Sequence, residues 1–508
     1  MFGLEHIFRL LRVGWVLVRY DAILPKEYEQ RLPLGWRFTG RLLHLFSRRR
    51  APKSPGARLA MALEKLGPAY VKFGQFLATR PDVIGVTAAQ DLGRLKDRLP
   101  PFSRERALDT INAELGDIEG QFGRVSEAMA AASIAQVHMA VHPRTGPAAV
   151  KILRPRIEKK LRREMAALHF GATAIELFSK DSRRLEPVQL VETVAQALER
   201  ELDLRLEAGA AAEFREVAQK EGFFQVPEID WTRSSKRVLT QTWIDGVALT
   251  DMTALDKAGA DRPALAMAIT RGFLAAALDH GFFHADMHEG NLIYGKDGKL
   301  WVVDFGIMGR IGAKERRYLA EILFGFLRRD YRRVAEVHQE AGYVPERHTV
   351  EEFAQALRAI GEPIFGKTAD GISMSRLLLQ LFDVTHLFGM HLRPELVMLQ
   401  KTMVQVEGVA RALDPKHDMW AASRPIVERW VKREISVDGM RRRVMDEAST
   451  GFGALRRLPQ TLAALEGAAN EVRRGPPPAQ RQGISWMSFF IGLAVGAVAV
   501  FIAYYAGL

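Results

Sequence analysis

The chain has 508 residues, more than one ordinary domain holds, so we expect at least two lobes with extensions. Its 72 basic and 60 acidic residues give a net charge of +12, which favours an anionic partner: phosphate, nucleic acid or a membrane surface. Cysteine is absent, which excludes disulfides and cysteine-ligated metals. We expect no secretory signal, because Arg9, Arg12 and Arg19 interrupt the first apolar run.

Residues 1–120 are expected to form a helical N-terminal extension. Residues 1–50 have the pattern of broken, basic amphipathic helices, whose cationic face either rests on anionic lipid or is ordinary solvated surface. Further on, Lys72 and Gln75 lie among apolar neighbours, where burial without partners would be costly. Taken alone, this segment favours a structural role, an amphipathic helix with a snorkelling lysine.

Residues 121–247 are expected to form a strand-rich lobe that ends in a strand at 238–243 and a hinge at 244–247. An alanine-rich turn joins two strands, and a third strand carries Lys151, the order of the nucleotide-covering hairpin and phosphate-contacting lysine in protein kinases. Alanines replace the usual glycines, which predicts a tighter nucleotide loop because a methyl group restricts positive φ. The turn comprises Ala130, Ala131, Ala132 and Ser133.

One long helix is expected at 187–214, with valines and leucines on its packed stripe. It carries Glu201, Asp203 and Glu207. The two glutamates are six residues apart, which places them about 120° apart around a helix, so each could reach a different lysine. Glu207 is the candidate ion-pair partner of Lys151. The alternative is that these acids only form a solvated helix face.

The strongest chemical signal is the stretch at 281–306, GFFHADMHEGNLIYGKDGKLWVVDFG. Asn291 follows Asp286 after four intervening residues. Two short apolar strands come next, and then Asp304, the first residue of a DFG triplet. This order matches the catalytic loop and metal-binding motif of protein kinases. Magnesium prefers oxygen ligands, and the strand pair would bring Asn291 and Asp304 together. Asp286 is therefore the candidate catalytic residue, and Asn291 and Asp304 are the candidate metal ligands.

This stretch has two other interpretations. In the first, Asp286 and Asn291 only cap a turn between strands. In the second, three histidines at four-residue spacing bind zinc from one face of a helix. A zinc-protease helix needs glutamate after its first histidine, where Ala285 stands, and two glycines interrupt any helix here. The histidines are His280, His284 and His288.

Residues 248–472 are expected to form a helical lobe around this loop. After Gly306 a helical pattern begins at once, over 313–326, without the long Ala-Pro-Glu segment that docks peptide substrates. In addition, Ala285 replaces the arginine that senses activation-loop phosphate in protein kinases. Both observations argue against a protein substrate.

Residues 484–508 carry no charge and, as a helix of about 38 Å, would cross a hydrocarbon core of ~30 Å. Aromatic residues near both ends and arginines before the segment predict a single C-terminal transmembrane helix, after a linker at 473–483, with the catalytic domain in the cytoplasm. A buried core helix is the alternative. Gly492 and Gly496 form a small-xxx-small pair that could join two copies in a homodimer.

Six motifs follow one another in a distinctive order: KFGQ from Lys72, the AAAS turn, AVK ending at Lys151, ERELD, HADMHEGN and DFG. Together they resemble the UbiB family, atypical kinase-like proteins of ubiquinone biosynthesis that are also known through the aarF-domain kinases. The resemblance covers roughly residues 60–310 by motif. It implies an α+β, atypical protein-kinase-like two-lobe fold with a helical N-terminal extension and a C-terminal transmembrane helix.

The resemblance also implies a site for ATP and Mg²⁺ beneath a lid contributed by the N-terminal extension. Lys72 in the lid would meet Glu201 and Asp203 and block access for peptides. Lys151 would contact the α- and β-phosphates. The other residues that it assigns to the nucleotide are Gln75, Glu207 and the Ala130–Ser133 turn.

By this resemblance the protein binds and hydrolyses ATP in support of ubiquinone biosynthesis at the inner membrane. Expected partners are membrane lipids, prenylated quinone precursors and other ubiquinone-biosynthesis proteins, and not nucleic acid. Glu289 departs from the family, in which proline is frequent there, and Gly209 and Ala210 stand where relatives often have Ala and Asn. Two other functional classes stay open. One is a nucleotide-binding pseudokinase scaffold. The other is a soluble phosphotransferase for drugs or sugars, and the KFGQ motif and the expected transmembrane helix argue against this second class.

Overall fold

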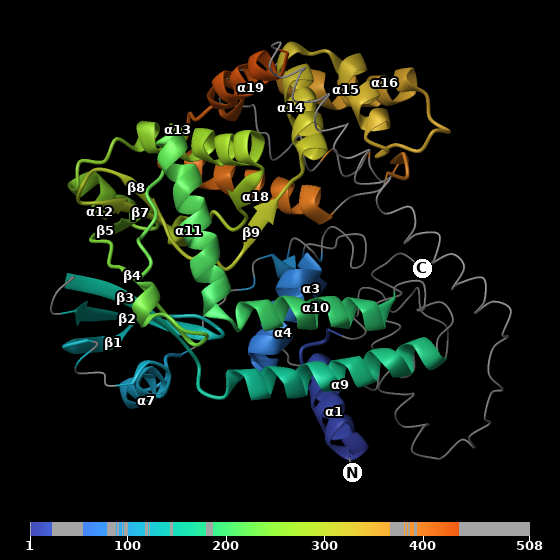
Figure 1. Ribbon diagram of the computed structural model, residues 1–508. Coiled ribbons are helices and arrows are strands. Elements are labelled where there is room, and N and C mark those ends of the chain that lie inside the picture. Colours follow the sequence, from blue (N-terminus) through green and yellow to red (C-terminus); the bar gives the residue numbers. More distant parts are fainter. Residues whose placement is uncertain are drawn as a thin grey trace, which may run out of the picture.

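The computed structural model shows two lobes, with a layer of helices laid along the smaller one (Figure 1). It describes residues 2–22, 54–78, 100–116, 122–142, 146–178, 186–365 and 394–435, and the isolated positions 88, 91–93, 95, 120, 380, 384 and 387–390. Within these ranges no helix is both long and apolar enough to cross a bilayer. The expected linker at 473–483 and span at 484–508 lie outside the described residues.

The smaller lobe is built on a four-stranded antiparallel sheet of order β1-β2-β3-β4. The strands are β1 (Arg124–Ala131), β2 (Ala135–His142), β3 (Gly146–Leu153) and β4 (Val238–Thr242). Helix α7 (Arg104–Leu115) packs on one face, where Ile111 and Phe122 close a small apolar core with Val150. Lys151 lies on the central strand β3, paired with Val137 on one side and Leu239 on the other. Its backbone is therefore fixed from both sides.

Three helices connect this sheet to the rest of the molecule: α9 (Ile157–Phe178), α10 (Pro187–Glu201) and α11 (Leu204–Glu221). The prediction of one continuous helix over 187–214 is wrong, because α10 and α11 run in different directions (Figure 1). The break follows from Asp203, which has an extended backbone (φ −120°) and accepts a hydrogen bond from the Arg205 amide as the N-cap of α11. Glu201 therefore ends one helix, and Glu207 lies in the first turn of the next.

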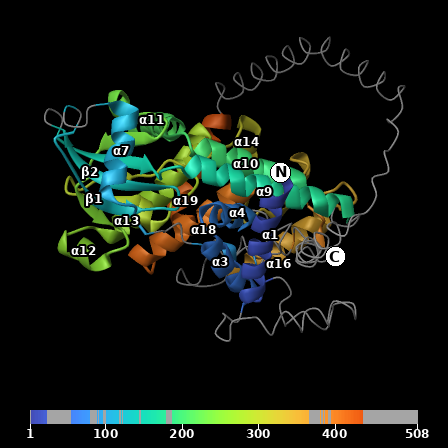
Figure 2. The same ribbon diagram turned by 90° about the horizontal axis from the view of Figure 1, so that it is seen from below.

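The N-terminal extension lies against α9 and α10 in both views (Figures 1 and 2). Its described helices are α1 (Phe2–Arg19), α3 (Pro55–Leu66) and α4 (Pro68–Ala78). The buried Glu164 of α9 holds two of them, because it accepts a hydrogen bond from Arg9 at 2.8 Å and one from the Tyr70 hydroxyl at 2.7 Å. Gly74 permits close packing of α4, since a Cβ there would lie 2.6 Å from a methyl carbon of Leu63.

The larger lobe is mainly helical and surrounds two small antiparallel sheets of order β5-β7-β8 and β6-β9. The strands are β5 (Gly246–Ala248), β6 (Phe282–His284), β7 (Leu292–Gly295), β8 (Leu300–Val302) and β9 (Met308–Arg310). The helices are α12 (Met252–Lys257), α13 (Arg262–Ala275), α14 (Ala313–Arg328), α15 (Tyr331–Glu340), α16 (Val350–Phe365), α18 (Pro394–Leu413) and α19 (Met419–Ile435). Helix α14 begins at Ala313, as the sequence predicts for the segment after the DFG triplet.

Candidate active site

The β7–β8 hairpin brings the two candidate metal ligands to neighbouring positions. Leu292 pairs with Val302 at its base, and the Val303 amide donates a hydrogen bond to the Asn291 carbonyl at 3.0 Å. Asp304 is the next residue. The Asn291 side chain donates through Nδ2 to the Asp286 carbonyl at 3.1 Å. Its Oδ1 is therefore the amide atom left to face a cation.

His284 connects the catalytic loop to the DFG triplet. Its Nε2 lies 2.9 Å from the Asp304 carbonyl, and its Nδ1 accepts a hydrogen bond from the Asp286 amide at 3.2 Å. These contacts select the neutral tautomer that is protonated on Nε2. Burial lowers the pKa of His284, which agrees with a neutral ring. One histidine side chain thereby links the backbones of the two candidate acids through two hydrogen bonds.

Asp304 of the larger lobe contacts Lys151 of the smaller lobe. Its backbone adopts a left-handed conformation (φ 64°), which is rare for a side chain larger than glycine and recurs at functional sites. Lys151 Nζ lies 2.9 Å from Asp304 Oδ1 and 2.7 Å from Glu207 Oε1. The ion pair expected between Lys151 and Glu207 is thus present, and one ammonium group joins β3, α11 and the DFG triplet.

The two acids on this lysine differ in their electrostatic surroundings. Burial raises the pKa of Glu207 to about 7, although Lys151 opposes this shift. Desolvation by the surrounding protein would also raise the pKa of Asp304, but the charge and hydrogen bond of Lys151 hold it below its ordinary value. The pKa of Lys151 is raised by both carboxylates against the effect of burial. Asp304 is therefore the acid that stays ionised and can bind a cation.

These donors fit magnesium. Asp304 supplies a carboxylate whose side chain is 49% exposed to the cleft, and Asn291 supplies an amide oxygen beside it. Hard divalent cations take such oxygen ligands and complete their shell with water and phosphate oxygens. Lys151 is placed to meet phosphate from the opposite lobe, as a kinase-type lysine does.

The alanine-rich turn is tied down, as expected for a tight loop. The Ala132 amide donates to the Ala135 carbonyl at 2.8 Å, and Ser133 is buried. The Arg154 guanidinium donates through one Nη to the Ala132 carbonyl at 2.8 Å. Ala130 and Ala131 are the last residues of β1 itself. Sequence reasoning missed Arg154, which lies three residues after Lys151 and would be recognised only from the folded turn.

The expected pairing of Lys72 is present with one of its two predicted acids. Lys72 Nζ lies 2.9 Å from Glu201 Oε2 at the end of α10. Asp203 is instead engaged by Arg205, whose guanidinium donates two hydrogen bonds to its carboxylate. The charge of Lys72 adds to that of Lys151 in lowering the pKa of Asp304, so the lysine lies within electrostatic reach of the cleft. Gln75 follows one turn later on α4, half-buried.

Asp286 is contacted from a helix that sequence reasoning did not connect with the site. Gln405 Nε2 donates to Asp286 Oδ1 at 3.1 Å, and Lys401 Nζ lies 3.7 Å from the same oxygen. Both side chains come from α18. The only sequence signal was the spacing of four residues, which places a lysine and a glutamine on one helix face.

The three histidines considered for zinc occupy separate surroundings. His280 contacts Glu221 at 2.9 Å, His284 joins the two loops, and His288 accepts a hydrogen bond from the Gly290 amide at 3.0 Å. Across the part of the chain that the structure describes, no three His, Asp or Glu side chains gather as a metal site.

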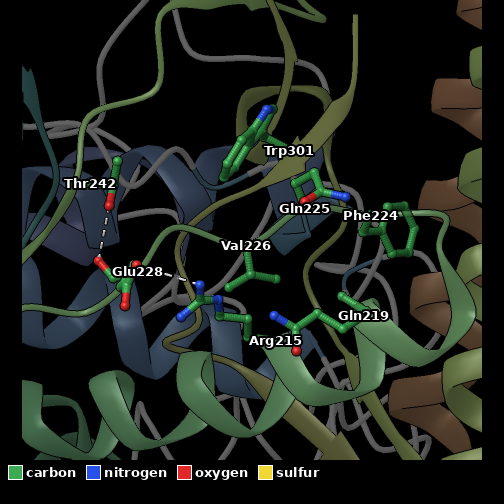
Figure 3. Close-up of a pocket in the computed structure, with 9 residues that line it drawn as sticks. Arg215, Gln219, Phe224, Gln225, Val226, Glu228, Thr242 and Trp301 are labelled. Atoms are coloured by element: carbon green, nitrogen blue, oxygen red, sulfur yellow. Dashed lines mark hydrogen bonds and ion pairs between the residues drawn. The ribbon is translucent and has the colours of Figure 1, made fainter. Parts of the chain in front are cut away.

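A separate cavity of about 190 Å³ lies between α11 and the edges of both lobes (Figure 3). Arg215 and Glu228 meet across it, and Trp301 of β8 closes one end (Figure 3). None of the predicted site residues lines it. The candidate active site is therefore the charged cluster around Lys151 and not this cavity.

Comparison with known proteins agrees with this geometry. Residues 94–338 match the ABC1 atypical kinase-like domain, and residues 357–418 match the UbiB helical domain. A probable protein kinase UbiB from Marinobacter nauticus is 38% identical over 468 residues, 90% of this chain and 85% of that protein. One from Pseudomonas putida is 36% identical over 517 residues, 96% of this chain and 93% of the relative.

Among solved structures, the Mycobacterium tuberculosis protein Rv3197 in complex with erythromycin shares the fold, with a TM-score of 0.50 and 21% identity. The match covers 77% of this chain and 98% of that one. At this identity the likeness concerns the fold alone, and it supports a kinase-like α+β architecture. With the two domain matches and relatives that span most of its length, the chain belongs to the UbiB family of atypical kinase-like proteins.

Proposed function

We propose that the protein is an ATP- and Mg²⁺-dependent kinase-like ATPase or small-molecule kinase that serves ubiquinone biosynthesis at the inner membrane. It would act on lipid precursors or on the biosynthetic complex. The observation that carries this proposal is the contact of Lys151 with both Glu207 and Asp304, with Asn291 beside Asp304. This set of charged and amide groups matches the phosphates and the cation of a magnesium nucleotide, and Asp286 beside it is the group that turnover would need in addition.

The roles follow from the contacts. Lys151 would bind the phosphates, with Glu207 holding its ammonium in place. Asp304 and Asn291 would hold Mg²⁺, which when bound neutralises charge on the phosphate oxygens. Asp286 would take the proton of the attacking hydroxyl group or water. The Lys72–Glu201 pair would keep the extension over the cleft and disfavour bulky peptides, and the expected membrane span would keep the protein near lipid substrates.

The competing proposal is a pseudokinase scaffold that binds nucleotide and lipid without turnover. It is supported by the hydrogen-bonded turn at Ala132 and by the Lys72–Glu201 contact of the N-terminal extension, both of which would restrict access to a bound nucleotide. Turnover is favoured because Lys151, Asp286, Asn291 and Asp304 all have the expected residue types in contacts that suit phosphoryl transfer.

One assay separates the two. Phosphate release is measured for the full chain in anionic liposomes, with and without a ubiquinone-like phenol, and compared with Asp304→Asn. The enzymatic proposal expects Mg²⁺-dependent release by the wild type that the variant loses. Equal release from both proteins would leave the scaffold as the better account. Phosphorylation of only a free sugar or drug would favour a soluble type of phosphotransferase.

A further inference from the structure

Helix α18 reaches Asp286 from outside the matched kinase-like domain, which ends at residue 338. It belongs to the segment matched by the UbiB helical domain at 357–418. Gln405 and Lys401 approach the same carboxylate oxygen, Oδ1, from successive turns of this helix. A catalytic acid held from a second domain suggests that this domain completes the reaction site.

A buried hydrogen bond also joins helix α18 to the catalytic loop. The Thr402 hydroxyl is fully buried and lies 3.1 Å from the Ala285 carbonyl, next in the chain to Asp286. Thr402 lies between the two side chains that contact the acid, so three positions of one helical surface meet two consecutive loop residues. This register determines where the side chains of α18 enter the cleft.

Gln405 and Lys401 make contacts of different kinds. The 3.1 Å separation of Gln405 Nε2 from Asp286 is a hydrogen bond, whereas the 3.7 Å separation of Lys401 Nζ is too long for one. The Lys401 side chain is also 37% exposed. Gln405 therefore holds the carboxylate, whereas Lys401 makes no side-chain hydrogen bond with the residues that the structure describes, so its ammonium can meet a second anion.

The catalytic loop supplies no permanent cation of its own. Between Asp286 and Asn291 it carries no lysine or arginine; its His288 accepts the Gly290 amide through Nδ1, and the His288 Nε2 lies 3.6 Å from the other Asp286 carboxylate oxygen, Oδ2. In the described part of the chain, Lys401 is the one lysine or arginine within 4.0 Å of the Asp286 carboxylate. A phosphoryl group passing Asp286 carries several negative charges, which need a cation on the acceptor side as well as at Lys151.

We propose that Lys401 is a catalytic residue that contacts the transferred phosphoryl group, with Gln405 as the positioning residue for Asp286. The inference rests on the proposed function. In the step it serves, the acceptor oxygen bonds to the γ-phosphorus of ATP and its proton passes to Asp286. The bond from phosphorus to the β–γ bridging oxygen breaks, and ADP leaves with the electron pair. With water as the acceptor, the products are ADP and inorganic phosphate.

The test compares Lys401→Met with Lys401→Arg and with a matched control, Lys416→Met. Lys416 is exposed and lies three residues beyond Leu413, the last residue of α18, which is itself about 18 Å along the helix from Lys401. Two quantities are measured for the full chain in anionic liposomes: the rate of phosphate release, and the affinities for Mg·ADP and for the Mg²⁺ complex of an imido analogue of ATP. Only the analogue carries the γ-phosphoryl group.

Lys401→Met should lower kcat about 100-fold, since removing one preorganised charge at a transition state has an effect of this order. Its affinity for Mg·ADP should stay within about twofold, and its affinity for the analogue should fall about tenfold, which corresponds to one lost charged contact. Lys401→Arg should recover part of both losses because it keeps the charge. Lys416→Met should match the wild type.

The outcomes separate this inference from the proposed function. A wild-type rate and wild-type analogue affinity in Lys401→Met would overturn the role of Lys401 and leave the ATPase intact. A second outcome is that the wild type releases no phosphate, while Lys401→Met alone loses the tighter binding of the analogue relative to Mg·ADP. In that case the contact of Lys401 with the phosphoryl group is supported, and the proposed turnover fails. An equal loss of affinity for both nucleotides would also overturn the inference, because it would indicate a general change of the cleft.

Discussion

The two acids of the cleft, Asp304 and Asp286, are held in opposite ways. Asp304 belongs to a charged cluster shared between the lobes, in which Lys151 Nζ lies within 2.9 Å of two carboxylates. Asp286 is held within the larger lobe by a neutral amide, with the nearest lysine at 3.7 Å. The first arrangement suits an acid that must remain ionised to bind metal. The second suits an acid that must exchange a proton.

This difference matters because the two sides depend on different parts of the molecule. The contacts of Asp304 require the two lobes to stay together, because Lys151 comes from β3 and its partner Glu207 comes from α11. The Asp286 side needs only the catalytic loop and α18. Substitutions should therefore separate nucleotide binding on one side from turnover on the other.

The largest effect is expected at Asp304. Asp304→Asn removes the charged metal ligand and leaves Lys151 with Glu207 alone, so both Mg·ATP binding and phosphate release should be lost, the rate falling at least about 10³-fold. Rate and nucleotide affinity are measured together, with Asp297→Asn in the exposed hairpin turn as the control. If Asp304→Asn kept the wild-type affinity for Mg·ATP, the assignment of Asp304 as a metal ligand would be wrong.

Asp286→Asn should affect turnover alone. The amide keeps the size of the carboxylate but cannot accept a proton, so kcat should fall by about 10²- to 10⁴-fold, the range for loss of a general base. Affinity for Mg·ADP should stay within about twofold, because no contact of Asp286 involves Lys151 or Glu207. A comparable loss of ADP affinity would show that the two sides are not separate.

Gln405→Leu sharpens the comparison on the Asp286 side. It removes the hydrogen bond that orients the carboxylate but keeps similar bulk, so kcat should fall about tenfold with an unchanged KM for ATP. Steady-state kinetics give both values. A rise in KM with unchanged kcat would place Gln405 in substrate binding instead of in positioning Asp286.

The smallest effect is expected at the lid. Lys72 and Glu201 form a part-buried ion pair at 2.9 Å, so Lys72→Met should lower the free energy of unfolding by about 1 to 3 kcal/mol. In a double-mutant cycle with Glu201→Gln, we expect a coupling energy of about 1 kcal/mol. Chemical unfolding of the four proteins measures it. Additive losses would mean that the contact does not fasten the extension.

Sequence could predict the two acids and the amide of the site because these residues lie in short motifs whose spacing fixes the geometry. Asp286, Asn291 and Asp304 are joined by one hairpin, and a hairpin follows from local alternation and a turn. The ion pair between Lys151 and Glu207 is also predictable from the sequence, but the helix geometry used to predict it is wrong. A continuous helix was expected to turn Glu201 and Glu207 apart, whereas an N-cap at Asp203 breaks the helix and redirects them.

The Asp286 side could not be predicted in the same way. Lys401 and Gln405 lie more than 100 residues from the loop that they contact. Their helix carries many polar residues, and spacing alone does not show which face meets the cleft. Only the packing of α18 on α13 and the catalytic loop selects that face. Contacts of this kind depend on tertiary structure, and the local four-residue spacing does not identify their partner.

The central claim, that Asp304 and Asn291 hold a magnesium nucleotide against Lys151, is tested most directly by calorimetric titration with ADP in the presence of Mg²⁺ and in the presence of a chelator. The wild type should bind ADP at least about tenfold more tightly with Mg²⁺, and Asp304→Asn should show no such dependence. Equal ADP affinity with and without Mg²⁺ in the wild type would contradict the account.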